Sequence, residues 1–245
     1  MKIVAIIQAR MGSTRLSGKV MKDLFGKTVL SHVIERVNQS ELVNDIIIAT
    51  TENENDDVIE EEALKCGAKV FRGSESDVLS RYYNAAKDNH ADVIVRITSD
   101  CPLIDPVIMD KIIDCYIQNT YDIVSNASSD LTKRTYPRGL DTEVFSFGEL
   151  EKAFLSAKES YQREHVTPYI YENAKQVYYY MNDINYSKYR WTLDTEEDWQ
   201  FITKVYEHLY REKHNFYLKE TIDLMCKYPD LYNINKHVEQ KKIKG

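Results

Sequence analysis

The chain has 245 residues, of which 43% are hydrophobic, enough to build one large α/β domain with a sizeable core. Its net charge of −7 and its pI of about 5.5 argue against a general nucleic-acid binder, because such proteins attract phosphate backbones with clustered positive charge. No apolar stretch approaches the roughly 20 residues of a membrane span, and no signal-peptide cleavage pattern follows the first apolar run. We therefore expect a cytoplasmic protein.

The first half of the chain alternates apolar, β-rich runs with helical patterns. Strands are expected at residues 3–7, 45–49, 69–71 and 93–97, and helices at about 29–37, 56–66, 77–87 and 106–117. The hydroxyl of Thr28 is placed to cap the first of these helices. This βαβ alternation predicts a parallel sheet flanked by helices.

The second half is more mixed. Short strands are expected at 122–124 and 142–145, separated by a polar segment with Ser128, Ser129 and Asp130 that suggests an excursion from the sheet. Residues 177–181 read as a strand with aromatic side chains on both faces, which favours the core or a dimer contact over base stacking. From Glu196 onward the pattern is helical and ends in a lysine-rich tail that we expect to fray.

The four cysteines, Cys66, Cys101, Cys115 and Cys226, show neither a C-x-x-C pair nor regular spacing. This favours reduced, mostly buried thiols over a disulfide framework or a zinc site. We expect no structural metal.

A cationic loop follows the first strand. Arg10, Arg15 and Lys19 supply positive charge there, and Gly12 and Gly18 allow backbone N–H groups to turn toward the same ligand. The spacing is not that of a P-loop, because five residues separate Gly12 from Gly18 and Val20 offers no hydroxyl to a magnesium ion. A G-x-G-x-x-G dinucleotide motif is also missing. The loop suits a triphosphate, and the alternative is an ordinary basic surface loop.

Ligands of open parallel sheets bind beyond the carboxyl ends of the strands. Thr50 and Thr51 follow the second strand, Asp100 follows the fourth, and Asp194 lies before the helical C-terminal part, where it or Thr195 would cap a helix. Mg²⁺ prefers a few carboxylate oxygens together with phosphate oxygens and water. Asp100 and Asp194 are therefore candidate ligands of a magnesium-bound polyphosphate, although a turn residue and a simple helix cap are the alternatives.

Several ordered motifs resemble the nucleotide-sugar cytidylyltransferases, most closely the SpsF-like branch of spore-coat polysaccharide biosynthesis, which is related to the synthetases of CMP-ulosonic and sialic acids. The motifs are QARMGSTRLSGK (8–19), ATT (49–51), RGSESDVL (72–79), RITSDCPLID (96–105), YPRGLDTE (136–143), REHVTP (163–168) and RWTLDTEED (190–198). The resemblance covers nearly the whole chain. It implies a three-layer α/β/α nucleotide-diphospho-sugar transferase fold, similar to GT-A glycosyltransferases, in one domain of residues 1–245.

The resemblance also assigns residues. It implies that the nucleotide, with CTP favoured, is held by Ala9, Arg10, Gly12, Ser13, Arg15, Lys19, Thr50, Thr51, Asp77 and Asp100. Arg10, Lys19 and Asp100 would be catalytic, and Asp100 and Asp194 would bind Mg²⁺. Residues 121–190 would contribute acceptor contacts and the interface of a homodimer. Ser17 stands where the family commonly has proline, and residues 74–78 match the family's base-reading motif only in part.

The implied reaction is nucleotidyl transfer, in which an acceptor oxygen attacks the α-phosphorus of the triphosphate and pyrophosphate leaves. Polar clusters in segments that look irregular suggest an anionic sugar as acceptor, because arginine forks suit carboxylates and phosphates. The acceptor candidates are Arg138, Asp141, Arg163, Glu164, His165 and Arg190. His165 is either a base, a substrate donor or a structural histidine.

Two other functions remain open. A glycosyltransferase of related architecture would hold a nucleotide sugar with an Asp-x-Asp element, for which Asp141-Thr-Glu143 is the nearest approximation. A non-catalytic nucleotide-binding protein is the other alternative, and the presence of Lys19, Asp100 and Asp194 speaks against it.

Overall fold

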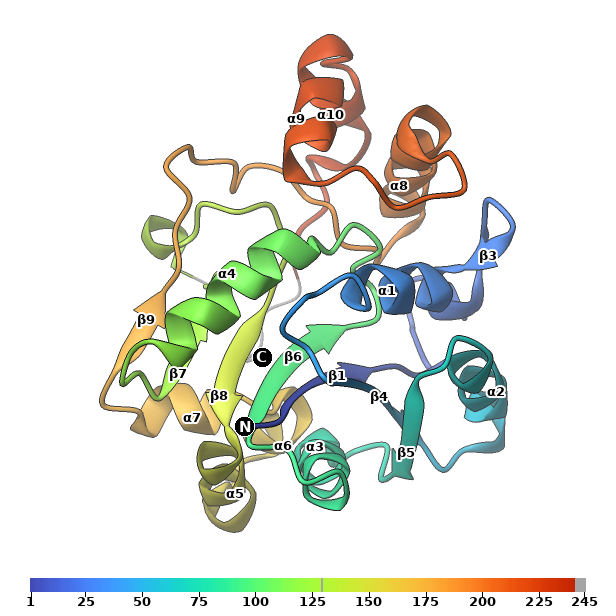
Figure 1. The fold of residues 1–245 in the computed structure, drawn as a ribbon. Helices are drawn as coiled ribbons and strands as arrows, with labels where there is room; N and C mark the ends of the chain where they lie inside the picture. Colours follow the sequence, from blue (N-terminus) through green and yellow to red (C-terminus); the bar gives the residue numbers. More distant parts are fainter. Residues whose placement is uncertain (129, 241–245) are drawn as a thin grey trace.

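The computed structural model describes residues 1–128 and 130–240, so Ser129 and the end of the lysine-rich tail lie outside it. Within these residues one sheet has seven strands, with helices on both of its faces (Figure 1). The strands are β1 (Ile3–Gln8), β4 (Asp45–Thr51), β5 (Lys69–Gly73), β6 (Val93–Thr98), β7 (Ile123–Ser125), β8 (Glu143–Ser146) and β9 (Val177–Tyr179). A small hairpin, β2 (Asp23–Leu24) and β3 (Lys27–Thr28), stands apart from the sheet.

The strand order is β5-β4-β1-β6-β8-β7-β9. Strand β1 pairs in parallel with β4 and β6, and β4 pairs in parallel with β5. These strands read as continuous apolar runs because both faces of the sheet are covered. The second half departs from this pattern, since β8 is antiparallel to both β6 and β7. The expected mostly parallel sheet is confirmed.

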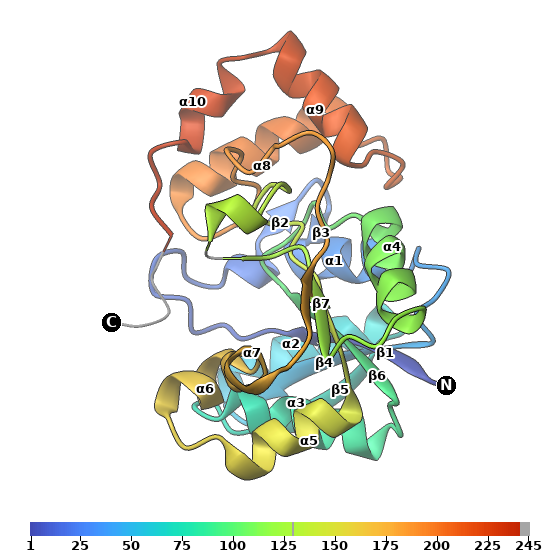
Figure 2. The same ribbon diagram turned by 90° about the vertical axis from the view of Figure 1, so that its left-hand side faces the viewer.

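The helices form a layer on each face (Figure 2). They are α1 (Val29–Val37), α2 (Asp57–Lys65), α3 (Val78–Asp88), α4 (Pro106–Ile117), α5 (Phe147–Ser156), α6 (Ser160–His165), α7 (Pro168–Asn173), α8 (Glu196–Leu209), α9 (Leu218–Lys227) and α10 (Leu231–Asn235). Alternate side chains of β1 pack on opposite faces of the sheet. Ala5 and Ile7 pack with α1, α4 and α8, whereas Val4 and Ile6 pack with α3, α5 and α7. The result is the expected three-layer α/β/α fold.

The local expectations hold best in the first half. Helices α1 and α4 have the expected limits, and the side chain of Thr28 caps α1 by accepting from Ser31 N. Thr50 and Thr51 differ from expectation, because they are the last residues of β4 and do not follow it. The segment of Arg163, Glu164 and His165, which looked irregular in the sequence, is helix α6, and α5 and α7 on either side of it were not expected.

The four cysteines are free thiols. Cys101 is buried, but Cys66 and Cys115 are partly exposed and Cys226 is exposed, so the expectation of mostly buried thiols was wrong. Within the part of the chain that the structure describes, no helix is both long and apolar enough to cross a membrane.

Candidate active site

The cationic loop leaves β1 and ends at the short 3-10 helix η1 (Lys19–Met21). Its start is fixed by Asp56, which is 2% exposed and accepts hydrogen bonds from Met11 N at 2.7 Å and from Thr51 Oγ1 at 2.5 Å. Its end is fixed at Gly18, whose φ of 61° lies in the left-handed region that glycine adopts without strain. Gly12 does not have a positive φ, so only Gly18 needs the conformational freedom that the sequence suggested for both. Asp56 belongs to no motif and was missed.

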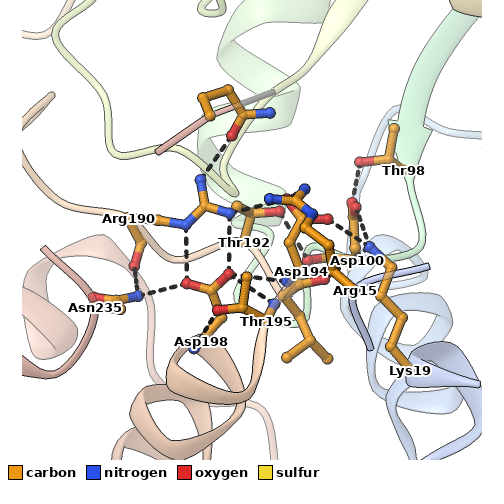
Figure 3. A network of polar contacts seen from close by, with 12 residues as sticks. Arg15, Lys19, Thr98, Asp100, Arg190, Thr192, Asp194, Thr195, Asp198 and Asn235 are labelled. Carbon is orange, nitrogen blue, oxygen red and sulfur yellow. Dashed lines mark hydrogen bonds and ion pairs between the residues drawn. The ribbon is translucent and has the colours of Figure 1, made fainter. Parts of the chain in front are cut away.

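Lys19 lies where three distant segments meet, as Figure 3 shows. Its Nζ donates to Asp100 Oδ2, to Asp194 Oδ1 and to the carbonyl oxygen of Leu193, each at 2.8 Å. Asp100 follows β6, and Asp194 precedes α8. The segments are also joined directly, because Leu193 N donates to the carbonyl oxygen of Asp100 at 2.8 Å. The structure thus brings the two carboxylates together around one ammonium group.

The charges in this cluster stabilise one another. Burial works against the charged form of Lys19, but Asp100 and Asp194 outweigh it and raise its pKa. Burial likewise disfavours the charged form of Asp100, yet Lys19 and the hydroxyl of Thr98, at 2.6 Å from Oδ1, lower its pKa. The lysine is therefore protonated and Asp100 is ionised at neutral pH.

Asp194 has further cationic partners. Arg15 Nη2 lies 3.0 Å and Arg190 Nη2 lies 2.9 Å from Asp194 Oδ2 (Figure 3). Arg190 is 6% exposed and is also paired with Asp198 on the first turn of α8. Thr195 caps that helix, accepting from Asp198 N at 3.3 Å, which settles the expected choice between Asp194 and Thr195. Asp194 is left free of a capping role.

A close backbone approach places the segment with Arg138 beside this cluster. Arg138 N donates to Tyr189 O at 3.1 Å, and Trp191 N donates to Arg138 O at 2.7 Å. Gly139 makes the approach possible: its φ is 99°, and a Cβ there would lie 2.5 Å from the carbonyl carbon of Trp191. The spacing of the two motifs gave no sign of this contact.

The expected acceptor residues fall into two groups. Near Arg190, Asp141 forms an ion pair with Arg134, which is 1% exposed, and burial raises the pKa of Asp141 despite that partner. Arg138 has no side-chain hydrogen bond or ion pair among the residues that the structure describes. Burial and then the charge of Arg134 lower the pKa of Arg138. An anion bound beside Arg138 would compensate its buried charge.

The second group lies on α6. Arg163 donates to Asp77 Oδ2 from Nη2 at 2.6 Å, and to the carbonyl oxygen of Phe154 from Nη1 at 2.7 Å. Asp77, an expected nucleotide ligand, also caps α3 by accepting from Ser80 N. Glu164 is exposed, and His165 is the last residue of α6. Arg163 and Asp77 therefore contact each other in this structure and do not join the Lys19 cluster.

The remaining nucleotide candidates lie at the start of the cationic loop or in β4. Arg10 is half-exposed and pairs with Glu75 at 3.2 Å, and Gly12 faces the same carboxylate. Ala9 is buried, with its N–H bonded to Ala49 O. Ser13 N donates to Met11 O at 2.7 Å, which closes the loop turn. Thr50 and Thr51 are buried in β4, and Thr50 Oγ1 has no partner among the described residues.

Comparisons with known proteins identify the family of the chain. Spore coat polysaccharide biosynthesis protein SpsF of Bacillus subtilis is 34% identical over 240 residues, which covers 93% of this chain and 95% of SpsF. A 3-deoxy-manno-octulosonate cytidylyltransferase of Trichlorobacter lovleyi is 38% identical over 122 residues, covering 49% of this chain and 46% of that enzyme.

A solved structure of a cytidylyltransferase from Leptospira borgpetersenii serovar Hardjo-bovis superimposes with a TM-score of 0.88 and 37% identity, covering 99% of this chain and 100% of that one. The family model described as cytidylyltransferase matches residues 4–242. The resemblance that the motifs indicated is confirmed, and the chain belongs to the cytidylyltransferase family of nucleotidyltransferases.

Proposed function

We propose that this protein transfers CMP from CTP to a hydroxyl of an anionic sugar and releases pyrophosphate, in a Mg²⁺-dependent reaction that serves surface glycan synthesis. The observation that carries the proposal is the ammonium group of Lys19 between Asp100 and Asp194, beyond the carboxyl end of β6. The names of the relatives support the choice of CTP and of a sugar acid, since one relative is a 3-deoxy-manno-octulosonate cytidylyltransferase. SpsF supports the link to polysaccharide synthesis.

The residues present fit a magnesium ion. Asp100 Oδ2 and Asp194 Oδ1 both lie 2.8 Å from Lys19 Nζ, so the two carboxylates already converge on one positive charge. Two carboxylates leave the other ligand positions to phosphate oxygens and water, as Mg²⁺ prefers. When bound, the ion would neutralise phosphate charge and make the acceptor hydroxyl more acidic.

The side chains supply the remaining electrostatics. The phosphates of CTP would offer Lys19 new partners in place of the carboxylates, and Arg10 and Arg15 lie on the same loop. The acceptor hydroxyl loses its proton to solvent and its oxygen forms a bond to the α-phosphorus. The bond from that phosphorus to the bridging oxygen breaks, and pyrophosphate carries the electron pair away. Positioned cations stabilise the charge that develops on the phosphates during this exchange.

Arg138 is our candidate for the acceptor's anionic group. It carries a charge with no hydrogen-bond or ion-pair partner among the described residues. Arg134 and Arg190 disfavour its charge, and Asp141 opposes them in part. A planar guanidinium binds a carboxylate through two parallel hydrogen bonds. A sugar acid is therefore the acceptor class that the charges favour.

A homodimer is part of the proposal. Strand β9 ends the sheet order and pairs with β7 alone among the described residues. Its Tyr178 stacks on Tyr121 and is 39% exposed, and Met181 and Ile184 beyond it are 48% and 59% exposed. An uncovered strand edge with apolar neighbours is a typical site of pairing between chains.

A thermal-shift series tests the nucleotide half of the proposal. CTP, UTP, GTP, ATP and dTTP are each added with and without Mg²⁺, since a ligand at about 100 times its dissociation constant adds roughly 2.7 kcal/mol of stability. We expect the largest shift with CTP and Mg²⁺, followed by pyrophosphate release with a panel of sugar acids. A shift with nucleotide sugars but with no triphosphate would replace the proposal with a glycosyltransferase, and binding without turnover across the panel would favour a non-catalytic protein.

A further inference from the structure

Asp198 is a fully buried carboxylate at the centre of the polar network in Figure 3. It accepts from Arg190 Nε at 2.9 Å and from Arg190 Nη2 at 3.0 Å, a two-point ion pair. It also accepts from the backbone N–H groups of Asp194 at 3.0 Å and Thr195 at 3.2 Å. One side chain thus fixes both the backbone of Asp194 and the arginine that contacts the carboxylate of Asp194.

Asn235, at the end of α10, closes the other side of the network. It is 2% exposed, and its Nδ2 donates to Asp198 Oδ1 and to the carbonyl oxygen of Arg190, both at 2.9 Å. Helix α10 packs along α8, so the C-terminal part of the chain contributes directly to the arrangement around Asp194. Among the described residues, neither side chain has a hydrogen bond or an ion pair with Lys19 or Asp100.

We propose that Asp198 and Asn235 are positioning residues for Asp194, an inference that rests on the proposed role of Asp194 as a metal ligand. Asp198 holds Arg190 in a two-point ion pair, and Arg190 donates one bond to Asp194 Oδ2 at 2.9 Å and orients that carboxylate. Without Asp198, the whole charge of a buried guanidinium would act on Asp194 and compete with a cation for it. Residues that orient a metal ligand in this way typically change metal affinity by 10–100-fold when they are replaced.

The test measures binding of Mn²⁺ by electron paramagnetic resonance, in the presence of CTP and without an acceptor, together with the melting temperature of each variant. Asp198→Asn and Asn235→Ala are compared with Glu196→Gln on α8 and Asn233→Ala on α10, which replace exposed residues of the same two helices. We expect Mn²⁺ affinity to fall about 10–100-fold for Asp198→Asn, to fall less for Asn235→Ala, and to stay unchanged in both controls.

Asp194→Ala distinguishes an error in the metal assignment from an error in the positioning role of Asp198 and Asn235. If it leaves Mn²⁺ affinity unchanged, the metal assignment in the proposed function is wrong. If it weakens Mn²⁺ binding while Asp198→Asn and Asn235→Ala change only the melting temperature, the two residues are merely structural and the positioning inference is overturned. Asn235→Ala removes no charged group. If Asp198→Asn does not fold, the Mn²⁺ affinity of Asn235→Ala tests the positioning role by itself.

Discussion

At the scale of single residues, Lys19 holds together two carboxylates that would otherwise repel each other. Asp100 and Asp194 each lie 2.8 Å from its Nζ, and the lysine side chain is only 11% exposed. Within the protein such like charges interact more strongly than in water. Lys19 would therefore stabilise the charge of bound phosphates, and it would also compete with a metal ion for the two carboxylates.

Replacing Lys19 with methionine tests both effects, because turnover and metal affinity should change in opposite directions. We expect turnover to fall on the order of 100-fold or more, because a positioned charge on the phosphates is lost. We also expect free Mn²⁺ to bind more tightly than in the wild type, because the competing ammonium is gone. Lys22→Met, which replaces a lysine placed over Trp199, is the matched control. Turnover near that of the wild type would contradict the assignment of Lys19.

Arg138 gives a second residue-scale prediction. Arg138→Met removes a guanidinium that is free to bind an anion, so the KM for a sugar-acid acceptor should rise about 10–100-fold, the usual worth of a charged hydrogen bond. The affinity for CTP, measured by calorimetry, should not change. Arg163→Met is the comparison: its guanidinium is already held by Asp77, so we expect a lower melting temperature and an unchanged KM. Equal KM effects of the two variants would argue against this division.

At the scale of elements, the site depends on how closely irregular segments lie against one another. The alternation of strands and helices up to α4 was predictable because it rests on local periodicity and on turn residues. The contact of Arg138 with Tyr189 and Trp191 was not, because it joins segments about 50 residues apart in the chain through backbone hydrogen bonds. Such bonds leave no pattern in side-chain hydrophobicity.

Gly139→Ala tests this contact. Its Cβ would lie within 2.6 Å of backbone atoms of Trp191 and Thr192 and would also adopt a φ of 99°. Gly67→Ala is the control, since its φ is 77° but nothing lies within 4 Å of the new atom. We expect Gly67→Ala to lower the free energy of unfolding by about 1 kcal/mol and Gly139→Ala to lower it by about 3 kcal/mol or more. Urea unfolding measures both, and equal costs would mean that the two segments do not approach so closely.

At the scale of the whole molecule, a buried pair of histidines joins the elements that carry the site. His32 on α1 contacts the carbonyl oxygen of Leu24 through Nε2 at 2.6 Å and His214 through Nδ1 at 2.7 Å. Because a carbonyl only accepts, neutral His32 must accept a hydrogen bond from His214 at Nδ1. The ring of Tyr206 packs on His32, and its hydroxyl donates to Pro102 O near Asp100.

The pair makes stability depend on pH. Burial lowers the pKa of His32 from 6.5 to about 4, and Arg36 and Lys27 add to this effect, whereas the carbonyl oxygen of Leu24 and Glu35 oppose it. Burial, Arg36, His32 and Lys27 lower the pKa of His214 to about 3, although Glu35 Oε2 lies 3.3 Å from its Nδ1 and favours its charged form. Between these values and 6.5 the unfolded chain binds more protons than the folded one, so stability rises with pH through this window and is lost as the pH falls through it. Each pKa unit of difference between the folded and unfolded states is worth about 1.4 kcal/mol, and Glu35 beside His214 reduces the total loss.

Urea unfolding at pH 7.5 and pH 5.0 measures this dependence. The wild type should be clearly less stable at pH 5.0, and His32→Asn combined with His214→Gln should show a smaller difference between the two pH values. His237→Gln, which changes an exposed histidine, should behave like the wild type. An equal pH dependence in the double variant would show that other groups control acid unfolding.

The sequence by itself determined the α/β alternation, the mostly parallel sheet, the cationic loop and the family, because each depends on local periodicity or on ordered motifs. It also indicated that Asp100 and Asp194 follow or precede elements that end at one edge of the sheet. Only the tertiary structure decided which charges meet: Lys19 lies between the two carboxylates, Arg190 is paired with Asp198, and Arg163 is paired with Asp77. The physical reason is that an arginine or a lysine has the same appearance in a sequence whether a partner neutralises it or not. Its partner is set by the packing of distant segments, and for that reason Arg138 is distinguished from the other expected acceptor arginines only in the folded chain.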